Sequence, residues 1–224
     1  MQDGFFRVAA ATVPVVLANP EENIRHIAET AAGLSSQGVR LAVFPELSVT
    51  GYTCGDLFHN STLLNATEEA LHTLAGMSKS FPSTAIVVGA PLRHGHRLLN
   101  CAVVIAGGEI RAVVPKTYIP NYNEFYEKRW FDSGHGETGT LLGAPLAADL
   151  LLDMGNEVKA GIEICEDLWT PIPPSCPPAI WRKAILDASV PPEVNTISEG
   201  NAPNRAATAA RASSTASRTC LAQP

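Results

Sequence analysis

The chain has 224 residues, of which 46% are hydrophobic and 17% are charged, a balance typical of one globular domain that buries a substantial core. Its formal net charge is −6 and it contains no run of Lys or Arg, which argues against nucleic acid as a partner. The sequence has neither a secretory leader nor an apolar stretch of about 18 residues, so we expect a cytoplasmic protein that does not enter a membrane.

The amino-terminal part predicts a strand, a helix and a second strand. An apolar run covers residues 5–13, and the sequence NPEE at 19–22 then supplies a helix cap, a proline at the first helical position and acidic residues in the first turn. Gly38 ends the predicted helix, and residues 39–44 form a short apolar strand. This order predicts a β-α-β unit with a parallel pair of strands.

Helical and apolar stretches continue to alternate along the chain. A polar, aromatic loop without a clear period is expected between residues 117 and 143. The other elements expected in this region are helix 67–79, strand 85–90, a hairpin of strands 98–105 and 110–114, and a strand pair at 150–153 and 158–164.

Three residues that could act together in catalysis, Glu46, Lys116 and Cys165, each follow a predicted strand. Loops that leave strand ends build the sites of layered α/β folds, so we expect these side chains to meet. A thiol attacks an amide as its thiolate, and the leaving amine needs a proton. Glu46 could accept and return that proton, while Lys116 could stabilise the thiolate and the oxyanion. Each residue alone is more often structural, so the combination carries the prediction of a cysteine-dependent amide hydrolase.

The cysteines and histidines do not predict a metal site. The five cysteines are scattered, odd in number and without a CxxC pair, so neither a disulfide framework nor a thiolate zinc site is indicated. The sequence HGH at 94–96 stands between two apolar runs, where a solvated hairpin tip is the better interpretation. We therefore predict no metal.

Three motifs resemble the nitrilase superfamily in their order along the chain: FPELSVTGY at 44–52, PKTYIPNY at 115–122 and CEDLW at 165–169. Two further stretches, TCGDLF at 53–58 and NEFYEKRWF at 123–131, are similar to the glutaminase domain of the glutamine-dependent NAD⁺ synthetases. The resemblance runs from about Arg7 to Ser175. It implies a four-layer α-β-β-α sandwich of the nitrilase type, here incomplete at the carboxyl end.

The resemblance also implies a reaction and a set of roles. L-Glutamine would be hydrolysed through a thioester on Cys165, without a cofactor, and the ammonia would pass to a synthetase domain that uses ATP and Mg²⁺ to amidate nicotinic acid adenine dinucleotide. Glu46 would be the general base, Lys116 the stabiliser of the thiolate and oxyanion, and Glu127 the residue that orients Lys116. The substrate would be contacted by Tyr122, Tyr52 and Phe125.

The chain departs from this family after about residue 175. We expect a glutaminase domain over 1–175 and a divergent, low-complexity tail over 176–224, in which only 179–188 looks helical or strand-like. No pyrophosphate loop of a synthetase domain is present. The family also implies a homo-oligomer and a synthetase domain or subunit as partner. Two alternatives stay open: a stand-alone amidase for another small amide, and an inactive truncated remnant or interaction module.

Overall fold

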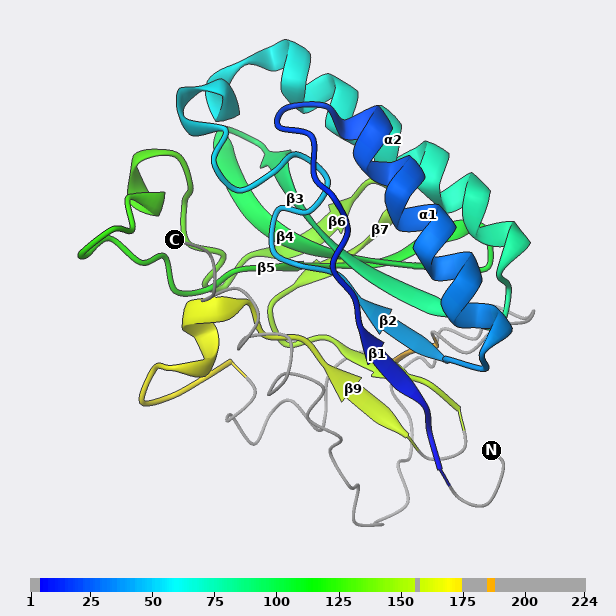
Figure 1. Ribbon diagram of the computed structural model, residues 1–224. Helices are drawn as coiled ribbons and strands as arrows, with labels where there is room; N and C mark the ends of the chain where they lie inside the picture. Colours follow the sequence, from blue (N-terminus) through cyan, green and yellow to red (C-terminus); the bar gives the residue numbers. More distant parts are fainter. Residues whose placement is uncertain (1–4, 156–157, 175–184, 188–224) are drawn as a thin grey trace.

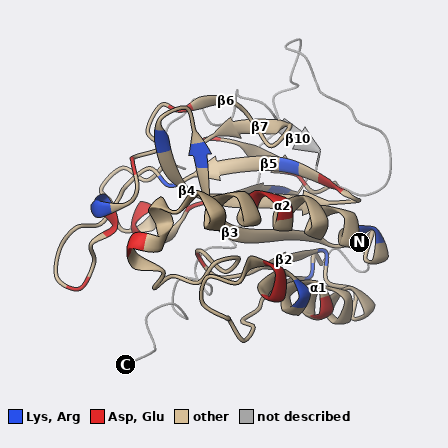
Figure 2. Cartoon of the chain, turned by 90° about the horizontal axis from the view of Figure 1, so that it is seen from above, with Lys and Arg blue, Asp and Glu red and all other residues tan. Residues whose placement is uncertain are grey.

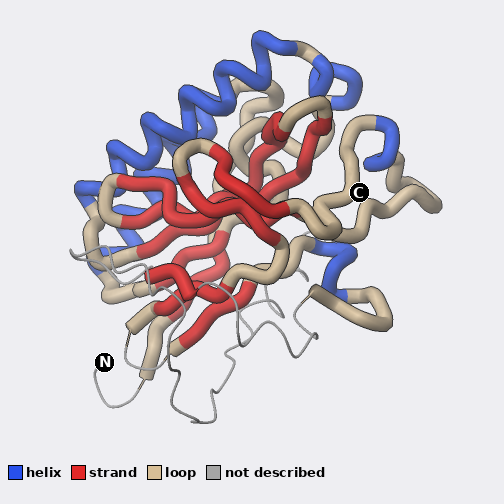
Figure 3. Tube along the Cα trace, turned by 180° about the vertical axis from the view of Figure 1, so that it is seen from behind, coloured by secondary structure: helices blue, strands red, loops and turns tan. Residues whose placement is uncertain are grey.

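A computed structural model describes residues 5–155, 158–174 and 185–187 of the chain. The strands of this part form two sheets, and the two long helices both pack on the larger sheet (Figure 1). The view from behind shows these helices on one side of the strands, and loops gathered at one end of the sheets (Figure 3).

The larger sheet has seven strands in the order β1-β2-β3-β4-β5-β7-β6. The pairs β1/β2, β2/β3 and β5/β7 are parallel, whereas β3/β4, β4/β5 and β6/β7 are antiparallel. The strands are β1 (Val8–Ala10), β2 (Leu41–Val43), β3 (Ala85–His94), β4 (Arg97–Ala106), β5 (Glu109–Pro115), β6 (Thr138–Leu141) and β7 (Ala144–Ala147).

Helices α1 (Pro20–Ser36) and α2 (Ser61–Met77) lie side by side on one face of this sheet (Figure 1). Their buried aliphatic residues form one apolar core with the sheet face beneath them. The Asn19 side chain accepts a hydrogen bond from the Glu22 amide and caps α1 as predicted. Short 3₁₀ turns complete the helical elements: η1 (Gly55–His59), η2 (Ser78–Ser80), η3 (Glu127–Arg129) and η4 (Cys165–Leu168).

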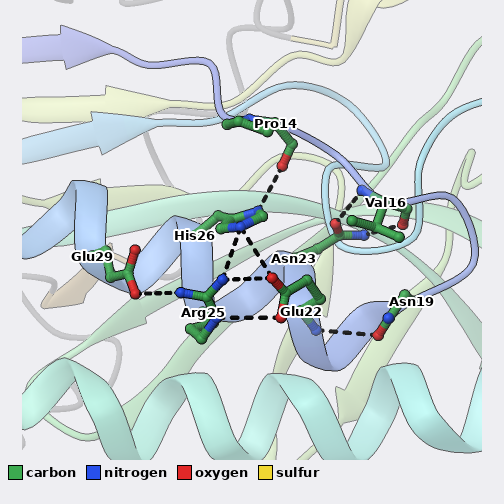
Figure 4. Close-up of polar contacts among 8 residues, drawn as sticks. All are labelled: Pro14, Val16, Asn19, Glu22, Asn23, Arg25, His26 and Glu29. Atoms are coloured by element: carbon green, nitrogen blue, oxygen red, sulfur yellow. Dashed lines mark hydrogen bonds and ion pairs between the residues drawn. The ribbon is translucent and has the colours of Figure 1, made fainter.

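The outer face of α1 carries basic and acidic residues next to one another (Figure 2). Arg25 pairs there with Glu22 and Glu29, one helical turn to either side (Figure 4). These side chains are exposed, so the pairs contribute little to stability.

A second sheet of three strands covers the other face of the large sheet. Its order is β10-β8-β9, with β8 (Leu151–Asp153) antiparallel to β9 (Lys159–Gly161) and parallel to β10 (Ile185–Asp187). A second apolar core, with Val87, Val104, Leu152 and Ile164 among its members, fills the space between the sheets. The described residues thus form an α-β-β arrangement, three layers of the predicted four-layer sandwich.

Several element boundaries differ from the sequence predictions. Helix α2 begins at Ser61, six residues earlier than expected, because the Asn60 side chain accepts a hydrogen bond from the Thr62 amide and caps it. The loop expected over 117–143 contains β6, which forms a hairpin with β7. Apart from Ile185–Asp187, the predicted low-complexity tail lies outside the described residues.

The segment between β1 and α1 is held against the loop that follows β2. Asn23 of α1 is fully buried, and its side chain bonds both the amide and the carbonyl of Val16 (Figure 4). The same side chain donates to the Val49 carbonyl at 2.9 Å. Asn23 therefore fixes Val15 and Leu17 beside the cavity described next.

Candidate active site

Glu46 lies in the tight turn that follows β2. The next residue, Leu47, has a left-handed backbone with φ of +52°. This turn packs directly on β3 at Gly89, where an added Cβ would stand 2.1 Å from the Leu47 nitrogen. Only glycine tolerates such an approach, so Gly89 lets the Glu46 turn sit against the centre of the sheet.

Lys116 follows β5 directly, and its side chain is completely buried. Its Nζ donates to Glu46 Oε1 at 2.7 Å and to Glu127 Oε2 at 2.7 Å. The side chains of Glu46 and Glu127 are only 7% and 2% exposed. One buried ammonium thus links two buried carboxylates that lie far apart in the sequence.

The charged groups of this cluster shift the pKa values of their neighbours. Burial would lower the pKa of Lys116, but the neighbouring Glu46, Glu127 and Cys165 outweigh it, so the pKa is raised and the ammonium stays charged. Burial and the Glu46 carboxylate raise the pKa of Glu127, against the opposing effect of Lys116.

Tyr52 extends the group on the far side of Glu127. Its hydroxyl donates to Glu127 Oε1 at 2.7 Å, so both oxygens of that carboxylate are engaged. Burial, followed by the charge of Glu127, raises the pKa of Tyr52 and keeps it a donor. Tyr52 therefore holds Glu127, in addition to the cavity-lining position expected from the sequence.

Cys165 is the first residue of η4 and is partly buried. Its φ is +48°, a left-handed conformation that costs about 1–3 kcal/mol for a residue other than glycine. Strain of this kind accumulates at functional sites, where the surrounding structure imposes it. The turn presents Cys165 to the same cavity that Glu46 lines.

Asp167 joins the Cys165 turn to the residues that follow Lys116. Its carboxylate accepts hydrogen bonds from the backbone amides of Thr117 at 3.1 Å, Tyr118 at 2.8 Å and Ile164 at 3.3 Å. Burial raises the pKa of Asp167 to about 6, against the effect of these donors and of Lys116. One carboxylate therefore fixes the backbone on both sides of the site.

We expect Asp167→Ala to lower the free energy of unfolding by at least about 2 kcal/mol, because it leaves buried amides without an acceptor. Urea unfolding followed by circular dichroism measures this. The matched control is Asp153→Ala, since Asp153 also accepts from a backbone amide, that of Gly155, but is partly exposed. Equal losses in the two variants would contradict the bridging role of Asp167.

The cavity has a volume of about 700 Å³, within the usual size range of small-molecule sites. Glu46 and Cys165 line it, together with the three aromatic residues predicted to contact substrate, Tyr52, Tyr122 and Phe125. The Tyr122 ring meets Phe125 edge-on at 5.8 Å. Acidic residues Glu163 and Glu166 also line the cavity. Every residue proposed from the sequence is therefore at the cavity or bonded to a residue that lines it.

The sequence analysis did not identify two residues of this group, Asn100 and Asp167. Asn100 donates to Glu46 Oε1 at 2.6 Å. Its signal in the sequence is a single amide among the apolar residues of the predicted strand 98–105. Asp167 stands within the recognised CEDLW motif, but its backbone partners could not be inferred from spacing.

Neither a metal site nor a membrane-spanning helix is found in the part of the chain that the structure describes. No group of three or more His, Cys, Asp and Glu side chains there could hold a metal ion. None of the described helices is long and apolar enough to cross a membrane.

Comparison with protein families gives a match to carbon-nitrogen hydrolase over residues 7–172. The glutamine-dependent NAD(+) synthetase of Mycobacterium bovis is 43% identical over 192 residues, covering 83% of this chain and 28% of the relative. The enzyme of the same name from Thermotoga maritima is 30% identical over 169 residues, covering 75% of this chain and 27% of the relative. The chain thus spans little more than a quarter of the length of these relatives.

Solved structures agree with these matches. A glutamine-dependent NAD(+) synthetase from Cytophaga hutchinsonii superposes with a TM-score of 0.65 at 26% identity, covering 72% of this chain and 28% of that one. A mutant of the Nesterenkonia AN1 amidase, from the nitrilase superfamily, gives a TM-score of 0.56 at 20% identity, covering 74% and 58%. The second likeness concerns the fold alone.

Proposed function

The chain belongs to the carbon-nitrogen hydrolase family and has the nitrilase-like fold expected from its motifs, and on that premise we propose that it hydrolyses the side-chain amide of L-glutamine. The observation that carries the proposal is one cavity lined by both Glu46 and Cys165, with Lys116 joining Glu46 to Glu127. These groups supply a nucleophile, a base and a fixed positive charge.

The proposed reaction has two halves. Glu46 takes the proton of Cys165, and the sulfur attacks the amide carbon to form a tetrahedral oxyanion beside Lys116. Glu46 then gives the proton to the departing nitrogen, which leaves as ammonia, and a thioester remains on Cys165. Water, deprotonated by Glu46, attacks the thioester, glutamate leaves, and the proton returns to sulfur.

Lys116 contributes through its fixed position. Its ammonium is buried, charged and held by two carboxylates, so it needs little reorganisation when negative charge develops next to it. A single preorganised donor of this kind is worth about 2.7–4 kcal/mol in other enzymes. Glu127, held in turn by Tyr52, keeps the lysine in place.

Two acidic residues of the cavity lining can serve as partners for the α-ammonium group of glutamine. Glu163 and Glu166 add negative charge, which suits a substrate that carries an ammonium group. The hydroxyl of Tyr122 donates to Glu166 at 2.7 Å and holds that carboxylate at the cavity wall. The names of the relatives, glutamine-dependent NAD(+) synthetases, point to the same substrate.

We propose that the ammonia is used by a part of the enzyme that these 224 residues do not contain. The relatives are named as synthetases and are several times longer than this chain. The amidation of a dinucleotide, with its ATP and Mg²⁺, would then belong to a synthetase domain or subunit that works together with this hydrolase unit. The glutaminase step itself is proposed to need no cofactor.

A panel of amides tests the substrate. The full chain is incubated, without ATP, with L-glutamine, with 4-carbamoylbutanoate, which lacks the α-ammonium group, and with propionamide. Release of ammonia is expected to have a kcat/KM at least about tenfold higher for L-glutamine than for either analogue. An equal or higher kcat/KM for propionamide would overturn the proposal in favour of an amidase for small neutral amides.

A further inference from the structure

Asn100 is a buried amide on β4, between apolar neighbours. It is 1% exposed, and its Nδ2 donates to Glu46 Oε1 at 2.6 Å. The same oxygen accepts from Lys116 Nζ at 2.7 Å. Two donors, one on β4 and one on the residue that follows β5, therefore converge on one atom of Glu46.

The backbone of Asn100 contacts Lys116, the charged partner of Glu46. Its carbonyl oxygen accepts a hydrogen bond from the Lys116 amide at 2.8 Å. Asn100 thus fixes the start of the Lys116 loop with its main chain and the Glu46 carboxylate with its side chain. One residue in the middle of the sheet sets the relative position of both.

Stability does not account for an amide at this position. Asn100 Oδ1 is buried and, within the described residues, has no hydrogen-bond partner. A buried acceptor without a partner costs free energy, and an aliphatic side chain would pack in the same strand without that cost. The useful part of the side chain is therefore the Nδ2 group that meets Glu46.

The geometry gives this hydrogen bond a chemical consequence. A carboxylate held through one oxygen by two donors cannot turn about its terminal bond without breaking both. Because Oε1 accepts from both donors, Oε2 is the oxygen that remains for proton transfer. Glu46 and Cys165 line the same cavity, so the orientation of Oε2 decides whether the thiol proton is within reach.

We propose that Asn100 is a positioning residue of the Cys165 reaction, which holds the Glu46 carboxylate by its amide so that the second oxygen receives and returns the proton. The proposal deepens the glutaminase function proposed above and rests on it for the identity of the substrate. Asn100 also lines the cavity, and its proposed role is exerted through the Glu46 carboxylate.

The groups around Glu46 predict how replacement of Asn100 would change the pH dependence of the reaction. Besides Asn100, the carboxylate is faced by Lys116, by Glu127 and Tyr52 on the far side of the lysine, and by Cys165 across the cavity. Loss of a donor disfavours the ionised form of a carboxylate, and a second carboxylate beside it does so more strongly. Both changes should move the acid limb of the reaction to higher pH.

The test compares Asn100→Leu and Asn100→Asp with the wild-type full chain. Two pH profiles are recorded: the rate of alkylation of Cys165 by iodoacetamide, followed by peptide mass spectrometry, and kcat/KM for glutamate release. We expect kcat to fall about tenfold or more with little change in KM, and the acid limb of both profiles to move up, by about one pH unit in Asn100→Asp. Asn65→Asp is the matched control, because it makes the same chemical change on the exposed face of α2, where Asn65 only accepts from Arg93.

Each outcome is decisive for Asn100. The proposal would be overturned if both Asn100 variants kept the wild-type pH profiles and kcat, or if Asn65→Asp showed the same shift. Failure of both Asn100 variants to fold would also overturn it, since Asn100 would then be a structural residue. If the wild-type chain is alkylated at Cys165 but releases no glutamate, the proposed function fails. The alkylation profiles still decide the role of Asn100 in that case.

Discussion

Replacement of Cys165 by alanine is expected to abolish the release of glutamate and ammonia from L-glutamine, with a loss in kcat of at least about 10⁴-fold. The side chain removed is the nucleophile that attacks the amide in the proposed reaction, and no thioester can form without it. The measurement is glutamate release by the purified full chain and by the variant at equal concentration, with no ATP present. Residual activity within tenfold of the wild type would rule out Cys165 as the nucleophile.

The matched control for this variant is Cys54→Ala. Cys54 is buried in a separate apolar cluster, and burial raises the pKa of its thiol. Glutamate release should therefore persist in this variant. The same comparison can be made by labelling: a glutamine-like electrophile should modify Cys165 much faster than Cys54 or Cys101, since burial also raises the pKa of Cys101. Equal labelling would favour the non-catalytic alternative, in which Cys165 only packs.

Replacement of Lys116 by methionine is expected to lower the free energy of unfolding at pH 7 by about 3–5 kcal/mol. The substitution keeps the length of the side chain but removes the ammonium that neutralises Glu46 and Glu127 inside the protein. Two buried carboxylates are then left without a cation. Activity should be lost together with stability, because in the proposed reaction the same ammonium stabilises the developing oxyanion.

The stability deficit of Lys116→Met should depend on pH in a defined direction. Burial already raises the pKa of Glu127, and loss of Lys116 removes the main influence that lowers it. The folded variant then binds protons more readily than the unfolded chain, so its stability rises as the pH falls. Urea unfolding at pH 7 and pH 5 should show a smaller deficit at pH 5. A deficit that grows toward low pH would contradict the buried-charge explanation.

The control for Lys116→Met is Lys159→Met, which breaks an ion pair with Asp153 in the second sheet. Both members of that pair are partly exposed, so water solvates the carboxylate that remains. The expected loss is about 1 kcal/mol or less. A large loss in this control would mean that charge removal in general, rather than burial, causes the effect at Lys116.

Local sequence features determined much of the framework. The cap at Asn19, the stop at Gly38 and the apolar runs around them predicted the opening β-α-β unit, because capping, turn preference and hydrophobic period act between near neighbours. The positions of Glu46, Lys116 and Cys165 after strands likewise predicted that they meet. The expected roles of Glu127, Tyr52, Tyr122 and Phe125 came from the resemblance to a family and not from their spacing in the sequence.

Some element boundaries were not predicted correctly from the sequence. Helix α2 begins at a local cap, the Asn60 side chain on the Thr62 amide, which lies before the apolar period that predicted the helix. The hairpin of β6 and β7 has only four residues in each strand, and its place is set by the pairing of β7 with β5. The first boundary thus depends on a local cap, and the second on a tertiary contact, the pairing with β5.

The connections within the site were decided by the tertiary structure alone. Tyr52 reaches Glu127 across 75 residues of sequence, Asn100 reaches Glu46 across 54, and Asp167 reaches Thr117 across 50. Spacing along the chain cannot predict such pairs, because they depend on which strands become neighbours and which side chains share a buried face. The sequence determined which chemical groups this protein possesses; packing of the two sheets decided that one buried lysine, two carboxylates and an amide would be held together beside a cysteine.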